Sequence, residues 1–134
     1  MNCYCGSDQE FEDCCQPFLS GINKPATAEA LMRSRYSAYV TANVDYLLRT
    51  VHPSTRKLHD AQTIEKWARS SSWQKLEVIS TVEGTAKDKK GMVEFKAYYL
   101  DEHQQLQIHH ELSDFLKELG KWFFVDGKVI EAGN

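Results

Sequence analysis

Apolar residues recur at helical spacing in the first half of the chain. A helix is predicted over residues 28–40, because Thr27 is a suitable N-cap and Leu31 begins an apolar stripe. Further helices are predicted to start after Asn43 and near Asp60, which also carry capping side chains.

From Trp73 onward apolar and polar residues tend to alternate, which is the period of two expected for partly buried strands. In the first of these, Leu76, Val78, Ser80 and Val82 are predicted to share one face. The strands are expected over residues 73–82, 92–100, 106–116 and 122–125. Helices followed by consecutive antiparallel strands are typical of the α+β class. We expect a cone of about three helices on a curved antiparallel sheet of about four strands.

Composition places the chain among globular proteins of one main domain. It has 134 residues, 42% of them hydrophobic, and a formal net charge of −3. No segment has the apolar length of a membrane span or a signal peptide, so we expect a cytoplasmic protein that does not bind membranes. The acidic balance disfavours nucleic acid as a partner.

The N-terminal segment, residues 1–20, contains Cys3, Cys5, Cys14 and Cys15. This spacing suits a tetrahedral structural zinc ion, which takes four soft ligands from two short cysteine pairs. A short helix capped by Ser7 is expected to carry the second pair back to the first. Crossed disulfides and buried free thiols are the alternatives, and a reducing cytoplasm favours zinc over both.

The same residues support a family resemblance. The N-terminal motif Cys-Tyr-Cys-Gly-Ser with the later Cys-Cys resembles the small zinc motif at the C-terminus of SecA. The matching segments of the body are LMRSRYSAYV at 31–40, DYLL at 45–48, HPST at 52–55, VEFKA at 93–97, HE at 110–111 and VDG at 125–127. With that motif they resemble the YchJ-like family of uncharacterised bacterial proteins. The resemblance implies a nuclear-transport-factor-two-like cone over residues 26–134.

Charge separates this N-terminal segment from the SecA-type motif, which is usually rich in lysine. Between its cysteine pairs stand Asp8, Glu10, Glu12 and Asp13, and no basic residue. A zinc ion with four thiolates adds about −2 more. We therefore expect a protein partner with a basic surface rather than a nucleic acid.

Two arginines of the first long helix are candidates for the body's functional site. Arg33 and Arg35 lie some 200° apart around a helix, so only one of them can point inward. An inward arginine needs an acidic partner, for which Glu94, Glu111 and Asp126 are available. Such an arginine is either half of a buried ion pair that joins helix to sheet or a binding group for an anionic ligand.

Histidine and aromatic residues add further candidates. His110 and Glu111 are adjacent on a strand and point to opposite faces, so at most one lines a cavity as a general base. Tyr36, Tyr39, His52, Trp73 and Trp122 are either core residues or the lining of a small-molecule site. The remaining histidines, His59, His103 and His109, are interpreted as solvated.

Three hypotheses for function follow. The first is a binding or adaptor protein in which a structural zinc site recruits a protein partner and the cone offers a ligand pocket. The second is a small enzyme that performs acid–base chemistry in the cone with His110 or Glu111, and it ranks lower because no nucleophile elbow, phosphate loop or catalytic metal triad is present. The third is a structural homo-oligomer, such as a dimer, that associates through its sheet.

Overall fold

The computed structural model describes residues 2–131, which fold into a helical layer packed on one sheet. The helical elements are the 3₁₀ turn η1 (Phe11–Asp13), α1 (Gln16–Leu19), α2 (Ala28–Val40), α3 (Val44–Arg49), the 3₁₀ turn η2 (Arg56–Leu58) and α4 (Ala61–Ser70). The strands are β1 (Ser72–Glu83), β2 (Lys90–Leu100), β3 (Leu106–Glu118) and β4 (Lys121–Val129). This order is the predicted α+β succession.

The three longer helices begin where their capping residues predict. The side-chain oxygens of Thr27, Asn43 and Asp60 each accept a hydrogen bond from a backbone N–H of the first turn, at 3.0, 3.0 and 2.9 Å. Each bond satisfies one of the donors that a helix leaves unpaired at its start. Sequence-local chemistry thus fixes the beginnings of α2, α3 and α4.

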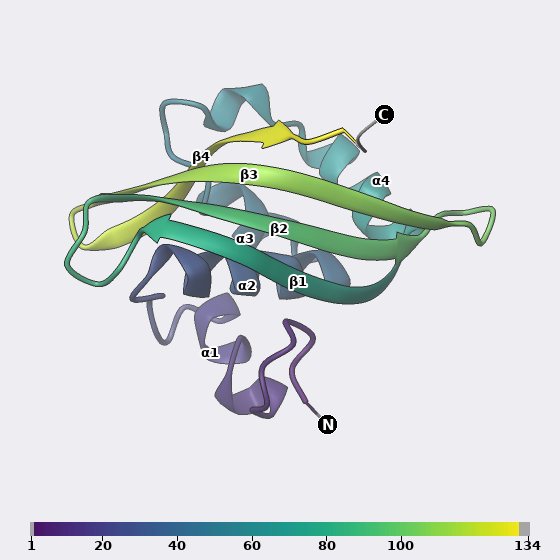
Figure 1. Ribbon diagram of the computed structural model, residues 1–134, viewed down its shortest axis with the longest axis horizontal. Helices are drawn as coiled ribbons and strands as arrows, with labels where there is room; N and C mark the ends of the chain where they lie inside the picture. Colours follow the sequence, from purple (N-terminus) through teal and green to yellow (C-terminus); the bar gives the residue numbers. More distant parts are fainter. Residues whose placement is uncertain (1, 132–134) are drawn as a thin grey trace.

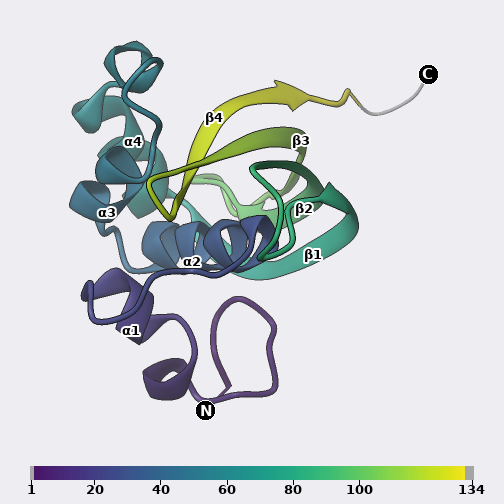
Figure 2. The same cartoon turned by 90° about the vertical axis from the view of Figure 1, so that its left-hand side faces the viewer.

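The strands form one antiparallel sheet in the order β1-β2-β3-β4. The sheet bends around α2, and α3 and α4 lie on the same side of it (Figures 1 and 2). The opposite face is left without helices. This confirms the predicted cone of helices on a curved sheet.

The core lies between α2 and the concave face of the sheet. Leu31, Val93 and Phe115 are at most 2% exposed there. The N-terminal cysteines belong to the same buried cluster, because Cys3, Cys5 and Cys15 are 5%, 0% and 1% exposed. The segment 2–20, called the cysteine head below, therefore packs on the body beneath α2 (Figure 2).

Two sequence predictions about the strands are corrected. A bulge at Ile79 shifts the register of β1 against β2, so the face predicted for Leu76 and Val78 does not continue to Val82, which is 55% exposed. A bulge adds one residue and turns every later side chain to the opposite face. The last strand runs to Val129 and not to Val125, because it pairs with β3 as far as Glu111.

The helix predicted from Ser7 to the second cysteine pair is also wrong. The segment forms only the turn η1, and the hydroxyl of Ser7 donates to Cys14 Sγ at 3.1 Å instead of capping a helix. Pro17 stands in the first turn of the following helix, α1, where proline needs no hydrogen-bond donor.

Among the helices of residues 2–131, none is long and apolar enough to cross a membrane.

Candidate functional site

The four cysteine sulfurs converge on one point of the head. Their Sγ atoms all lie within 4.8 Å of one another. Cys5 and Cys14 are 3.6 Å apart and Cys14 and Cys15 4.0 Å apart. Tetrahedral zinc with Zn–S bonds near 2.3 Å separates its sulfurs by about 3.8 Å. No disulfide joins the four cysteines, and the separations of their sulfurs fit a four-coordinate metal.

The electrostatics of the sulfurs also favour a cation. A hydrogen bond from Cys15 lowers the pKa of Cys5 to about 4. Burial raises the pKa of Cys14 to about 11, and the bond to Cys5 raises the pKa of Cys15. A negative charge on Cys5 thus disfavours ionisation of Cys14 and Cys15, and a bound cation would offset this repulsion.

Backbone turns bring the two cysteine pairs together. The amide of Cys3 donates to the carbonyl of Gln9 at 2.8 Å, which closes the loop between the pairs. Gly6 curls the chain directly after Cys5 with a φ of +91°, a conformation that glycine adopts without strain. The loop, rather than the predicted helix, delivers the ligand geometry.

Side chains of α2 hold the head against the body. Arg33 donates from Nη1 to the carbonyl of Cys5 at 2.6 Å, and its Nε binds Glu29 at 2.9 Å. One turn further along, Ser37 Oγ lies 3.7 Å from Cys3 Sγ. Arg33 thus pairs with a carboxylate of its own helix. The sequence analysis offered Glu94, Glu111 and Asp126 to the inward arginine, which is Arg35.

The outer side of the head is strongly acidic. The side chains of Asp8, Glu10, Glu12 and Asp13 are all exposed, on the loop and turn between the two cysteine pairs. These four carboxylates give this side of the head one sign of charge.

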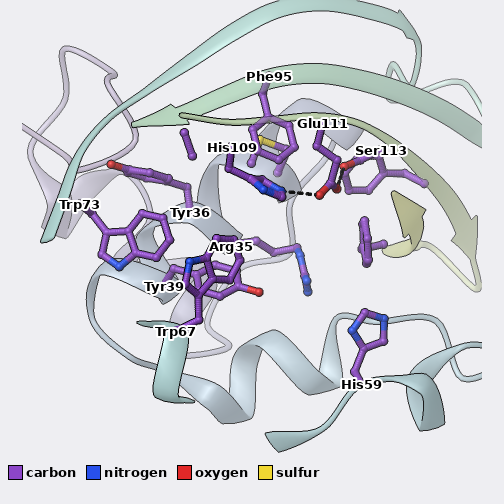
Figure 3. Close-up of a pocket in the computed structure, with 14 residues that line it drawn as sticks. Arg35, Tyr36, Tyr39, His59, Trp67, Trp73, Phe95, His109, Glu111 and Ser113 are labelled. Carbon is purple, nitrogen blue, oxygen red and sulfur yellow. Dashed lines mark hydrogen bonds and ion pairs between the residues drawn. The ribbon is translucent and has the colours of Figure 1, made fainter. Parts of the chain in front are cut away.

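A second candidate site is the cavity inside the cone. It has a volume of about 140 Å³ and lies between α2, α4 and the concave face of the sheet, to which all four strands contribute (Figure 3). Its lining is mainly aromatic, with a few polar groups, which is the composition of small-molecule sites. The lining residues are Met32, Arg35, Tyr36, Tyr39, His59, Trp67, Trp73, Phe95, Ala97, His109, Glu111, Ser113, Phe115 and Phe124.

Arg35 is the buried cation of this cavity. It is 8% exposed, and its Nη1 donates to the carbonyl of Leu47 at 2.8 Å and to Thr50 Oγ1 at 2.6 Å. Its guanidinium stacks 4.7 Å from the centre of the Phe124 ring. No carboxylate of residues 2–131 forms an ion pair with it, so the acidic partner predicted for an inward arginine is missing from the described chain.

The other donors of Arg35 remain available. Its Nε and Nη2 make no hydrogen bond within the described chain. Because every buried side-chain nitrogen and oxygen in that part of the molecule has a partner, these two groups are reachable from the cavity they line. Burial lowers the pKa of Arg35, but a guanidinium stays protonated at neutral pH.

A polar row on β3 faces Arg35 across the cavity. Glu111 accepts from Ser113 through Oε2, and its Oε1 lies 2.7 Å from His109 Nε2 (Figure 3). Burial acts to raise the pKa of Glu111, but the hydrogen bonds of His109 and Ser113 and the charge of Arg35 outweigh it and lower that pKa. Glu111 is therefore a carboxylate, and the His109 nitrogen facing it carries a proton.

Aromatic rings form the opposite wall. The ring centres of Tyr39, Trp67 and Trp73 lie 5.1 to 5.5 Å from one another. The Trp67 ring also lies 5.1 Å from that of His109 and fixes its position. Burial and the charge of Arg35 also lower the pKa of His59, another lining residue, which is neutral at pH 7.

The structure brings some of the predicted site residues together and separates the others. Arg35, Tyr36, Tyr39, Trp73 and Glu111 line the cavity. The remaining predictions lie elsewhere: Arg33 at the head, His110 paired with Glu94 on the convex sheet face, His52 bound to Glu118, Trp122 bound to the Ala26 carbonyl, and Asp126 exposed.

Sequence reasoning missed His59, Trp67, His109 and Ser113, and it wrongly treated the first and third as solvated. A signal for two of them was present, because His109 and Ser113 stand two residues on either side of Glu111. Residues at this spacing share a face of a strand. Once Glu111 points inward, both neighbours do so as well.

The fold and the cysteine cluster define a class: an α+β cone protein with an N-terminal four-cysteine motif suited to a metal. A family model described as "YchJ, middle NTF2-like domain" matches residues 27–127. The chain belongs to this YchJ family, as the resemblance in its sequence indicated.

Relatives and solved structures agree with this assignment. UPF0225 protein GSU1048 of Geobacter sulfurreducens is 42% identical over 96% of this chain and 80% of its own length. UPF0225 protein plu2503 of Photorhabdus laumondii is 44% identical over 93% of this chain and 79% of its own. These relatives carry no named activity.

Two solved structures, both described as SEC-C motif containing proteins, have the same fold. RPA3114 of Rhodopseudomonas palustris, solved in solution, has a TM-score of 0.89 at 39% identity and covers 98% of this chain and 100% of its own. A crystal structure from Psychrobacter arcticus has a TM-score of 0.80 at 34% identity and covers 98% of this chain and 84% of its own.

Proposed function

We propose that this protein binds a small planar ligand in the cone cavity, with an anionic or carbonyl oxygen of the ligand on Arg35. The supporting observation is the state of Arg35, a guanidinium that is 8% exposed and has no ion-pair partner in the described chain. Arg35 makes no direct ion pair, although its charge interacts with that of Glu111 across the cavity. A ligand oxygen bonded to its free donors would offset part of the cost of burying the guanidinium. The aromatic wall supplies the flat apolar contact that such a ligand needs.

The cysteine head serves this function as a structural zinc site. Four thiolates complete the tetrahedral shell of zinc and leave no position for water or substrate, so the ion holds the head folded and takes no part in chemistry. The head packs on α2 through Arg33, and the same helix carries Arg35 and Tyr36 into the cavity. Zinc would therefore support the wall that binds the ligand.

The test uses simple aromatic carboxylates as probes. Trp67 and Trp73 line the cavity, so binding of benzoate, phenylacetate or phenylpyruvate is expected to quench tryptophan fluorescence in a saturable way. Arg35→Met should weaken binding by about tenfold or more, since a hydrogen bond to a charged group contributes about 1.5–3 kcal/mol.

Two further variants control for folding and for charge. Arg35→Lys keeps the positive charge and is expected to bind with intermediate affinity, while its thermal unfolding shows whether the cone is intact. Arg69→Met removes an exposed arginine that pairs with Glu65 on α4, and should bind like the wild type. The proposal fails if no carboxylate saturates the wild type, or if Arg35→Met binds as tightly as Arg69→Met.

A second proposal is that the head recruits a protein with a basic surface. Its exposed carboxylates, Asp8, Glu10, Glu12 and Asp13, support this idea. Binding of a lysine-rich peptide should weaken with added salt and with the quadruple change of these residues to Asn and Gln. Equal binding by that variant, or tight binding of duplex DNA by the wild type, would contradict it.

A further inference from the structure

His109 is held more rigidly than a solvated histidine. Its Nε2 lies 2.7 Å from Glu111 Oε1, and Ser113 donates to the other oxygen of the same carboxylate. The Trp67 ring, 5.1 Å away between centres, packs against the imidazole. Glu111 itself lies close over the backbone of Gly127, where any Cβ would overlap its carboxyl group. The hydrogen bond to the Glu111 carboxylate thus orients the imidazole and places a proton on Nε2.

The second nitrogen of His109 is free to react. Nδ1 makes no hydrogen bond among residues 2–131, and no buried side-chain nitrogen in that range is without a partner, so Nδ1 is accessible. Because Glu111 holds the proton on Nε2, Nδ1 carries the lone pair in the neutral ring. The ring lines the same cavity as Arg35 (Figure 3).

From this geometry we infer that the cavity is catalytic, with His109 as a general base that moves a proton on a small planar carbonyl compound. The inference rests on the proposed function, because the same Arg35 must hold the substrate oxygen. Glu111 is a positioning residue, since both of its oxygens are already engaged. This differs from the expectation that His110 or Glu111 would be the base.

The step is a keto–enol tautomerisation of a 2-oxo acid that carries a flat apolar group. Nδ1 of His109 takes the proton from the carbon next to the ketone. The electron pair of that C–H bond becomes the C=C bond, and the π pair of the C=O bond moves to the oxygen, which Arg35 stabilises as an enolate. His109, now cationic beside Glu111, returns the proton to that oxygen and is neutral again.

Phenylpyruvate is a suitable probe because it combines an aromatic ring, a carboxylate and an acidic C–H. Its tautomers differ in ultraviolet absorption, so turnover and quenching of Trp67 and Trp73 are measured on the same zinc-loaded protein. His109→Gln should lower kcat by about 10²–10⁴-fold, the usual contribution of a general base, with little change in KM.

His110→Gln is the matched control. His110 is the next residue of the strand, its side chain is 21% exposed against 22% for His109, and it also pairs with a glutamate, but on the convex face. It should keep kcat within about twofold of the wild type, because its ring is remote from the bound probe. Glu111→Gln should lower kcat less than His109→Gln and leave KM nearly unchanged, which a general loss of folding would not do.

The outcomes separate the two proposals. If phenylpyruvate binds in an Arg35-dependent way but is not turned over faster than in buffer, the catalytic inference is wrong and the ligand site stands. If it neither binds nor reacts, both are wrong. Equal kcat for His109→Gln and wild type, or an equal loss in His110→Gln, also overturns the role of His109.

Discussion

The cysteine head and the cone cavity are built by different means. All four sulfurs of the head come from residues 3–15, a stretch with almost no apolar interior of its own. The cavity draws its lining from Met32 to Phe124, on α2, α4, the segment between η2 and α4, and all four strands. Under the zinc proposal the head would depend on a bound ion to stay folded, whereas the cavity depends on the whole core.

Helix α2 connects the two regions. Arg33 and Ser37 contact the head, and Arg35, Tyr36 and Tyr39 line the cavity. The 100° turn per residue of a helix sends these neighbours in different directions. A local metal site can thus support a non-local cavity through one rigid element, and four experiments test how far this holds.

The largest effect is expected from breaking the metal site. Cys5→Ser removes a sulfur that is fully buried, and small cysteine sites bind zinc with apparent free energies of about 10–16 kcal/mol. Elemental analysis should find well below one equivalent of zinc, and amide NMR should show the head unfolded while the strands persist. Asp8→Asn, on the exposed loop, should keep its zinc. Full zinc content in Cys5→Ser would show that the head does not depend on four sulfurs.

The contact between the two regions is the next target. Arg33→Met removes the bond to the Cys5 carbonyl and the pair with Glu29. We expect a loss of about 2–3 kcal/mol in the free energy of unfolding by denaturant, because the carbonyl keeps no charged donor. Arg69→Met also removes a pair four residues apart, with Glu65, but this pair is exposed, so the change should have little effect. Equal effects would mean that Arg33 does not hold the head.

A smaller effect is expected inside the cavity from Gly127→Ala. The added methyl group overlaps the Glu111 carboxyl, which His109 and Ser113 hold in place. We expect destabilisation of about 1–2 kcal/mol. In a Glu111→Ala background, Gly127→Ala should lower the free energy of unfolding very little, because the clash is gone. A double-mutant cycle measures this difference. If the losses of stability from the two changes simply add, Glu111 does not contact Gly127.

The smallest effect is expected on the stability of the protein at acidic pH. The pKa of Glu111 is lower in the folded protein than in the unfolded chain, so the unfolded state binds its proton first as pH falls. Its contribution to stability is present above about pH 4.3 and is lost as pH falls through the folded pKa. Glu111→Gln should therefore flatten the acid side of the stability profile measured by denaturant unfolding. An unchanged slope would contradict the charge state assigned to Glu111.

The sequence alone determined the features that depend on neighbouring residues. The N-caps at Thr27, Asn43 and Asp60 and the convergence of four cysteines follow from side chains a few positions apart. The period of two after Trp73 was enough to predict the strands and, with the helices before them, the α+β class. Such features form from short-range bonds, so their signals are local in the chain.

Only the tertiary structure decided which faces turn inward and what they meet. Alternation along β3 separates His109 from His110, but the pairing with β2 and β4 is needed to say which one faces the helices. The neutral partners of Arg35, the Leu47 carbonyl and Thr50, come from another helix and its end. The bulge at Ile79 turns the later side chains of β1 to the opposite face, and the alternation of apolar and polar residues gives no sign of it. Each of these depends on contacts between distant segments, which one-dimensional periodicity does not encode.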